Sequence, residues 1–194
     1  RVLVSDLSGK SNIKYKAKEL NIDLEDNEEI AKDLVAHIKK MENEGYQFEV
    51  AEASFELMML RKKGVFIPYF DVVDSRVNVC CDQLGENKTD AILKVKVNND
   101  IEHTAADGVG PVDALNNALK KALLRFYPNL EKVNLTDYKV RVLNEKDGTQ
   151  AKVRVLIESS DGESHWSTVG VSENIIEATW QSLSDSFNYH LMKK

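Results

Sequence analysis

The sequence is poor in cysteine, in basic charge and in long hydrophobic segments, and each shortage excludes a class of protein. Its two cysteines, Cys80 and Cys81, are neighbours in a strand-like stretch, where successive side chains point to opposite faces, so they are poorly placed to bridge each other. There is no second cysteine pair to form a zinc site. The 26 Lys and Arg residues against 32 Asp and Glu residues give a net charge of -6, which disfavours a protein that tracks the nucleic-acid backbone.

Membrane and export signals are lacking as well. No uninterrupted apolar run approaches the length of a bilayer span, and no charged-then-apolar signal segment opens the chain. We therefore expect a cytoplasmic protein without membrane or nucleic-acid partners. The 194 residues, of which 42% are hydrophobic, suffice for one large domain or two small ones. Because the chain starts at Arg1 without a methionine, we expect it to be a piece of a longer protein.

The first third of the chain has helical periodicity. Apolar residues recur at helical spacing over residues 28–44, and Gly45 follows as a stop. A second helix is predicted over residues 51–63, closed by Gly64. A Ser/Gly turn leading into a short helix is predicted in residues 7–20. This part of the chain is therefore predicted to be mainly helical.

After about residue 75 the pattern changes to alternation. Apolar and charged residues alternate in 91–97, 138–142 and 151–157, which is typical of half-buried strands in an antiparallel sheet. Two further helices are predicted over 111–126 and 173–192. Residues that favour hairpin turns lie between the predicted strands, at Asn98-Asn99-Asp100, Asp147-Gly148 and Asp161-Gly162.

The order strand, strand, strand, helix occurs twice in this region. The stretch "AILKVKV" at residue 91 resembles "AKVRVLI" at residue 151, an offset of about sixty residues. We therefore predict an α+β fold with two pseudo-symmetric βββα units, whose helices lie on one side of the sheets.

Two glycines precede the first of these helices. Gly108 and Gly110 stand before Pro111, which suits the first helical position. The free N–H groups of a first helical turn favour an anion. Residues 104–116 contain no Lys or Arg, so a phosphate would be poorly neutralised and the carboxylate of a small zwitterion fits better. The alternative, which the motif alone favours, is a tight turn with Asp113 as a local helix cap.

The other candidates for chemistry are weaker. His103 and His165 each precede a strand that leads into a predicted helix, but neither has a second His, Cys or carboxylate at metal-binding spacing. No Ser-His-Asp order and no reactive-cysteine context is found. We therefore predict neither a metal site nor catalytic residues in this chain.

Several stretches together resemble the C-terminal part of the 2-isopropylmalate synthase family: "RVLVSDLSGKSNI", "GYQFEVAEASFEL", "HTAADGVGPVDALNNAL", "LTDYKVRVL" and "TVGVSENIIEATWQSL". The likeness covers essentially the whole chain, and the first, second and last stretches most resemble its citramalate synthase branch. The resemblance implies a helical linker subdomain over residues 1–75 and a regulatory domain over residues 76–194. It also implies an acetyl-CoA-dependent acyltransferase whose N-terminal TIM barrel, with its divalent metal, is absent here, so no cofactor is expected in this fragment.

The resemblance further implies that the regulatory domain forms a homodimer and binds the end-product amino acid, isoleucine or leucine, as a feedback inhibitor. Carried over by motif, the effector-binding residues are Gly108, Val109, Gly110, Val112, Asp113, Leu135, Tyr138, Val142, Thr149 and Ala151. A dimerisation scaffold whose effector site has lost its function stays open as an alternative, as do the roles of the linker loop "SGKSN" and of Tyr15. An enzyme in its own right is disfavoured, because no acid, base or metal set converges.

Overall fold

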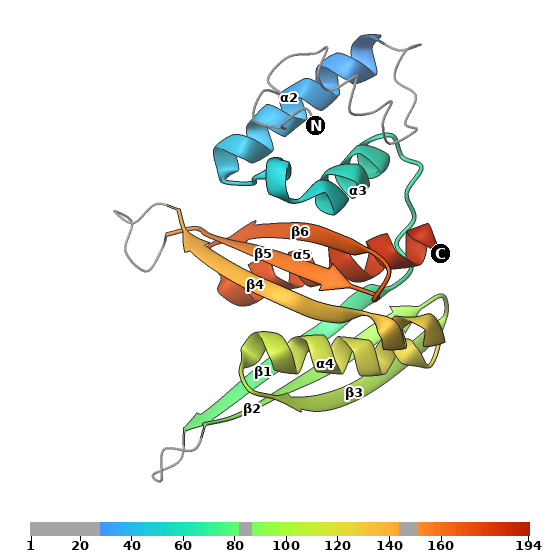
Figure 1. Cartoon of the computed structure of the whole chain (residues 1–194), viewed down its shortest axis with the longest axis vertical. Helices are drawn as coiled ribbons and strands as arrows, with labels where there is room; N and C mark the ends of the chain where they lie inside the picture. Colours follow the sequence, from blue (N-terminus) through green and yellow to red (C-terminus); the bar gives the residue numbers. More distant parts are fainter. Residues whose placement is uncertain (1–27, 82–86, 144–150) are drawn as a thin grey trace. The chain divides into compact units, whose positions relative to one another are not determined.

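The computed structural model describes residues 28–81, 87–143 and 151–194, which contain helices followed by two three-stranded sheets (Figure 1). The predicted α+β class and the two βββα units preceded by helices are confirmed. In chain order the elements are α2 (Glu28–Glu44), the 3₁₀ turn η2 (Phe48–Val50), α3 (Glu52–Lys62), β1 (Asp71–Cys81), β2 (Asn87–Val97), β3 (Asp100–Gly108), α4 (Pro111–Leu124), the 3₁₀ turn η3 (Pro128–Lys132), β4 (Asn134–Val142), β5 (Val153–Ser160), β6 (His165–Ser172) and α5 (Ile175–Lys193).

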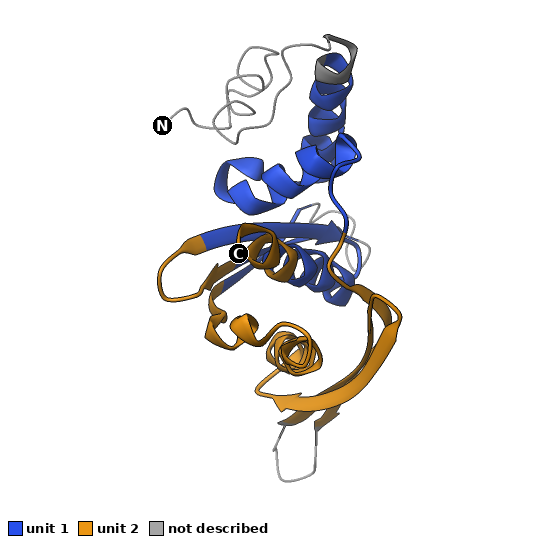
Figure 2. Cartoon of the chain, turned by 90° about the vertical axis from the view of Figure 1, so that its right-hand side faces the viewer, with its two compact units in different colours: residues 1–67, 138–157, 166–186 blue, residues 68–137, 158–165, 187–194 orange. Residues whose placement is uncertain are grey.

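The chain divides into two compact units, each assembled from separate stretches (Figure 2). Unit 1 joins the described residues up to Ile67 with residues 138–157 and 166–186. Unit 2 consists of residues 68–137, 158–165 and 187–194. The whole first repeat, β1 to α4, therefore lies in unit 2, whereas helices α2 and α3 share unit 1 with most of the second repeat. The predicted division between residues 75 and 76 stays a prediction.

The core of unit 1 joins the two leading helices to β6. Glycines end both helices where predicted, because Gly45 and Gly64 have φ of +111° and +71°, which favour a residue without a side chain. Arg154 of β5 donates from Nη1 to the carbonyl of Gly45 at 2.8 Å and so holds the end of α2. The buried cluster draws its residues from α2, η2, α3 and one face of β6: Leu34, Ile38, Phe48, Ala51, Phe55, Met58, Met59, Val169 and Val171.

The first sheet has the order β1-β2-β3 with antiparallel neighbours. Helix α4 covers the face that carries Ala91, Leu93 and Val95, all fully buried (Figure 1). Leu93 is paired with Thr104 of β3, whose Oγ1 donates to the carbonyl of Ala118 in α4 at 3.1 Å. The predicted alternation in 91–97 is confirmed, since this strand buries every second residue beneath one helix.

The second sheet has the order β4-β5-β6, and α5 covers one of its faces. Trp166 donates from Nε1 to Ser186 Oγ at 2.9 Å, and Thr168 donates from Oγ1 to the carbonyl of Ser182 at 2.8 Å. A β-carbon added to Gly170 would run into the carbonyl oxygen of Ala178, so the missing side chain lets α5 lie close to β6. The predicted helix over 173–192 is confirmed, beginning two residues later than expected.

Two of the three predicted hairpin turns are confirmed. Asn98 joins β2 to β3 with φ of +53°, and Gly162 joins β5 to β6 with φ of +89°. The backbone N–H of Ser164 donates to Asp161 at 2.8 Å and, together with the N–H of Glu163 and the ammonium of Lys194, lowers the pKa of that carboxyl to about 2. The predicted turn at residues 147–148 and the predicted helix in residues 7–20 lie outside the described residues. In the described ranges no helix is both long and apolar enough to cross a bilayer.

Candidate functional site

The two glycines before α4 have different roles. A β-carbon on Gly108 would collide with the backbone nitrogen of Ala114, so this glycine is required for β3 and α4 to approach each other. Gly110 caps the helix in an extended conformation that any residue adopts, and a β-carbon there would meet no atom within 4 Å. Packing therefore explains Gly108 but leaves open space beside Gly110.

Hydrogen bonds of this turn leave part of the first helical turn uncapped. Asp113 Oδ2 accepts the backbone N–H of Val109 at 3.0 Å, which is the local contact expected by the alternative of a tight turn. Gly110 supplies no side chain to the helix, and its carbonyl accepts the N–H of Ala114 at 2.9 Å. The N–H groups of Val112 and Asp113 belong to the first turn, where they have no acceptor within the helix. The start of α4 therefore offers two donors to an external group.

The corresponding start of α5 is closed by its own side chains. Asn174 Oδ1 accepts the backbone N–H groups of Ile176 at 2.9 Å and Glu177 at 3.4 Å. Ser172 Oγ donates to Glu177 Oε2 at 2.7 Å and accepts the N–H of Asn174 at 3.1 Å. Because an asparagine cap satisfies the first-turn donors of α5, this helix has less to offer an anion than α4.

The remaining predicted effector residues lie on or near β4 and β5. Leu135 and Tyr138 are half-buried on β4, and Val142 is 45% exposed at its end. Ala151 is buried just before β5. The backbone N–H of Leu143 donates to the carbonyl of Lys152 at 2.8 Å, which brings the neighbouring residues Val142 and Ala151 to the same end of the β4–β5 pair.

The ten predicted effector residues are divided between the two units, and one of them lies outside the described residues. The five residues from Gly108 to Asp113 form one turn in unit 2, where Val109 is 94% exposed and Val112 is half-buried. Leu135 also belongs to unit 2, whereas Tyr138, Val142 and Ala151 belong to unit 1. Thr149 lies outside the described residues. The assignment of an effector site to this set stays a prediction.

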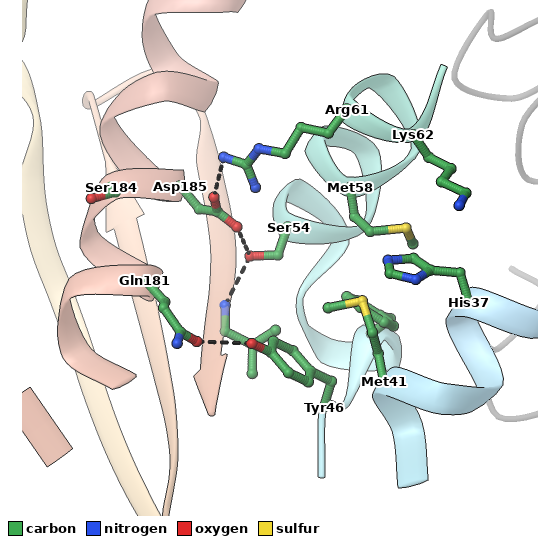
Figure 3. Close-up of a pocket in the computed structure, with 12 residues that line it drawn as sticks. His37, Met41, Tyr46, Ser54, Met58, Arg61, Lys62, Gln181, Ser184 and Asp185 are labelled. Carbon is green, nitrogen blue, oxygen red and sulfur yellow. Dashed lines mark hydrogen bonds and ion pairs between the residues drawn. The ribbon is translucent and has the colours of Figure 1, made fainter. Parts of the chain in front are cut away.

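Unit 1 contains a cavity that the sequence did not point to (Figure 3). Its volume is about 490 Å³, and its walls come from α2, η2, α3, β6 and α5. We call it the polar cavity, because an ion pair and several polar side chains line one side of it. Its lining residues are His37, Met41, Tyr46, Phe48, Ser54, Met58, Arg61, Lys62, Val169, Gln181, Ser184 and Asp185.

The polar side of this cavity is organised around the buried carboxylate of Asp185. Arg61 Nη2 donates to one of its oxygens at 2.7 Å, and Ser54 Oγ donates to the other at 2.7 Å. Ser54 Oγ in turn accepts the backbone N–H of Val169 at 3.0 Å, which ties α3 to both α5 and β6. Burial raises the pKa of Asp185, and the Arg61 guanidinium opposes that rise.

A second polar pair lines the same cavity. The hydroxyl of Tyr46 donates to Gln181 Oε1 at 2.8 Å (Figure 3). That oxygen also accepts the backbone N–H of Val171 at 2.9 Å. Burial raises the pKa of the Tyr46 hydroxyl. The imidazole of His37 lies on the opposite wall, and its pKa is lowered by burial and by the charges of Lys62 and Lys40.

Metal-binding clusters are absent from the described part of the chain. No group of three or more His, Cys, Asp or Glu side chains there could hold an ion. His103 on β3 and His165 at the start of β6 are both exposed.

Comparison with known proteins assigns the chain to a family. Residues 49–191 match the model of the LeuA allosteric (dimerisation) domain. The chain belongs to this family. It is 54% identical to the (R)-citramalate synthase of Geobacter sulfurreducens and 50% identical to that of Aquifex aeolicus, in both cases over 100% of this chain and 37% of the relative. It is also 30% identical to the 2-isopropylmalate synthase of Methanocaldococcus jannaschii over 54% of this chain and 18% of that protein.

The predicted resemblance is thereby confirmed, including its greater likeness to the citramalate synthase branch. The family match extends from η2 to α5 and covers both βββα repeats and α3. The chain spans 37% of the length of the two citramalate synthases named above. It carries the regulatory and dimerisation domain of the family.

Proposed function

We propose that the chain is the regulatory part of a citramalate synthase and binds isoleucine or leucine as a feedback inhibitor. Five matches to proteins named (R)-citramalate synthase, at 39–54% identity over 98% or more of this chain, support this branch of the family. In this proposal the catalytic barrel, which uses acetyl-CoA and a divalent metal, belongs to the same polypeptide. Two copies of the regulatory part form a homodimer, as the name of the family suggests.

The observation that carries the effector proposal is the contrast between the starts of α4 and α5. Helix α5 is capped by Asn174, whereas α4 has Gly110 at the same place and open space beside it. We propose that the carboxylate of the effector accepts the N–H groups of Val112 and Asp113, which replaces the missing cap. The helix dipole adds to this attraction.

Feedback requires that the effector prefer one arrangement of the dimer. A ligand shifts a conformational equilibrium only by the difference in its affinities for the two states. We therefore propose that isoleucine or leucine binds more tightly to the dimer arrangement in which the start of α4 has the conformation described above. Within the same unit, hydrocarbon contacts would come from the predicted residue Leu135.

A pair of reciprocal cap variants tests this site by isothermal titration with isoleucine and leucine. Gly110→Asn gives α4 the cap of α5, so its side chain competes with the ligand for the first-turn donors and the affinity falls by about tenfold or more. Asn174→Gly is the matched control, which opens α5 and leaves the affinity unchanged. Equal affinity in both variants, or no heat with the unmodified chain, would contradict the proposal.

A dimerisation scaffold without a working effector site is the second candidate. It is favoured by the contact of Asp113 with the N–H of Val109, which closes part of the turn internally. Light scattering and thermal melting separate the two candidates. A scaffold forms a dimer whose mass and melting temperature do not respond to either amino acid.

A further inference from the structure

We propose that the polar cavity of unit 1 is a second binding site, specific for a short-chain aliphatic carboxylate. All residues that line the cavity belong to unit 1, whereas the start of α4 belongs to unit 2, and the inference does not depend on the proposed effector site. Its volume of about 490 Å³ falls in the range of small-molecule pockets. The chemistry of its two walls selects the ligand.

The polar wall favours an anion. Asp185 is the acidic residue that lines the cavity, and each of its oxygens already accepts a hydrogen bond. Arg61 donates one hydrogen bond to Asp185. Most of its five N–H groups therefore remain available to another acceptor. Lys62 also lines the cavity, on the side of His37 (Figure 3), and its ammonium has no ion-pair partner among the described residues. The donors available at this wall are therefore those of Arg61, and Lys62 adds a positive charge on the side of His37.

Apart from His37 and Lys62, the rest of the cavity wall is largely apolar. Phe48 and Val169 are each only 1% exposed and Met58 is 6% exposed, while Met41 packs against the same cluster. Methionine side chains adapt to irregular hydrocarbon shapes. A fully hydrated anion such as phosphate would leave these walls without a partner. A carboxylate with a branched four- or five-carbon chain is small enough for the cavity and contacts both the Arg61 donors and the apolar wall.

Binding of such a ligand would strengthen the link between α3 and α5. Arg61 lies in the last turn of α3 and already contacts Asp185 of α5. A carboxylate that accepts the remaining Arg61 donors adds a charge-assisted hydrogen bond at the same point. Because only the folded state offers this site, the ligand raises the melting temperature of the chain.

Three probes test the chemistry by isothermal titration and thermal melting of the full 194-residue chain. We expect saturable millimolar binding of 3-methylbutanoate, binding of acetate that is at least about tenfold weaker, and no binding of 3-methylbutan-1-ol. Inorganic phosphate serves as the fourth arm and is expected not to bind. Absence of saturable 3-methylbutanoate binding overturns the proposal, as does equal binding of the alcohol or of phosphate.

Charge variants locate the bound probe. Lys62→Gln is expected to weaken binding by about two- to fivefold, because it removes a positive charge that faces the bound carboxylate across the cavity. Lys40→Gln is the matched control, since Lys40 influences His37 but does not line the cavity. Arg61→Lys keeps the charge beside Asp185 but loses the planar fork, which weakens binding by about tenfold. If Lys62→Gln and Lys40→Gln weaken binding equally, the probe is attracted by the general charge of the surface, and the assignment of the site to this cavity is wrong.

Two further readouts separate this site from the effector site. A carboxylate in the cavity raises the pKa of His37, which NMR titration of its imidazole measures directly. The Gly110→Asn variant is expected to bind 3-methylbutanoate unchanged. Loss of 3-methylbutanoate binding in that variant, or an unchanged pKa of His37, would mean that the probe binds elsewhere and would overturn the proposal.

Discussion

The two βββα repeats share their internal packing and differ in what surrounds the last strand. Thr104 of β3 and Thr168 of β6 each donate to a helix carbonyl fourteen residues later. Gly108 and Gly170 each let the following helix approach the strand without a collision of its backbone with a β-carbon. These shared contacts indicate that the duplication seen in the sequence preserves one way of packing a helix on a strand.

The differences lie on the outer side of the last strand. Residues of β3 alternate between half-buried and exposed, whereas β6 is buried on almost every residue from Trp166 to Val171. In unit 1 the second face of β6 packs in the cluster that contains α2 and α3. The second repeat has therefore become part of a larger core, while the first keeps an uncovered face and an uncapped helix start.

The largest effect is expected where a helix touches a strand without a side chain between them. Gly170→Ala places a β-carbon against the carbonyl of Ala178 and forces α5 away from β6, which costs about 2–3 kcal/mol of unfolding free energy. Urea denaturation measures this loss. Gly110→Ala is the control, because its β-carbon meets no atom within 4 Å. Equal stability of both variants would show that the close approach is not a constraint.

A smaller effect is expected at the ion pair of Arg61 and Asp185 in unit 1. Arg61→Gln leaves Asp185 buried beside Ser54 without its cation, which costs about 2 kcal/mol at neutral pH, less than a fully buried pair because Arg61 is partly exposed. The loss of the cation raises the pKa of Asp185 further. A carboxyl with a raised folded-state pKa destabilises the fold once pH exceeds its unfolded value of about 3.9.

The pH dependence of the Arg61→Gln variant therefore has a definite sign. The difference in unfolding free energy between the variant and the unmodified chain (the stability gap) becomes smaller as pH falls towards 4, because Asp185 is then increasingly protonated in the unfolded state as well as in the folded state. Melting temperatures between pH 4 and pH 8 measure the gap. The control is Arg61→Gln made in an Asp185→Asn background, where the gap caused by the arginine change stays flat over this range. A gap that widens on acidification would contradict this assignment of the buried carboxyl.

Local patterns in the sequence predicted the repeats but not their surroundings. Alternation in 91–97 and the apolar stripe of 111–126 each depend on residues close in sequence, so they appear in the structure at nearly the same bounds. The helix predicted over 111–126 ends at Leu124, within the usual uncertainty of a helix end. The run from Thr168 to Val171 does not alternate, and this was the available signal that β6 is covered on both faces.

The polar cavity could not be predicted because its partners are distant in sequence. Arg61 and Asp185 are 124 residues apart, and Ser54 and Asp185 are 131 residues apart. No spacing rule for helices or strands connects such residues. The glycines before α4 show a related limit, since both match the same motif while only Gly108 is required by packing.

A moderate effect is expected from the two threonines that the repeats share. Thr168 is fully buried and contacts both the carbonyl and the hydroxyl of Ser182, whereas Thr104 is half-buried. Thr168→Val is therefore expected to cost about 1–1.5 kcal/mol and Thr104→Val about 0.5 kcal/mol, because water can replace part of the lost bond at the exposed site. Urea denaturation midpoints measure both losses of stability. A larger loss for Thr104→Val than for Thr168→Val would contradict the prediction that burial sets the contribution of this hydrogen bond.

The smallest effect is expected from the helix caps, where stability and function should oppose each other. Gly110→Asn supplies the missing cap of α4 and is expected to raise the free energy of unfolding by a few tenths of a kcal/mol, while Asn174→Gly lowers it by about as much. Because these changes are near the limit of denaturant titration, hydrogen exchange of the first-turn amides at Val112 and at Ile176 is the sharper measurement. Slower exchange at Val112 in Gly110→Asn, together with weaker amino-acid binding, would mean that α4 forgoes a cap in order to leave its donors available. Unchanged exchange at Val112 would instead mean that Asp113 already closes the turn, and the two repeats would then differ only in the cover of their last strands.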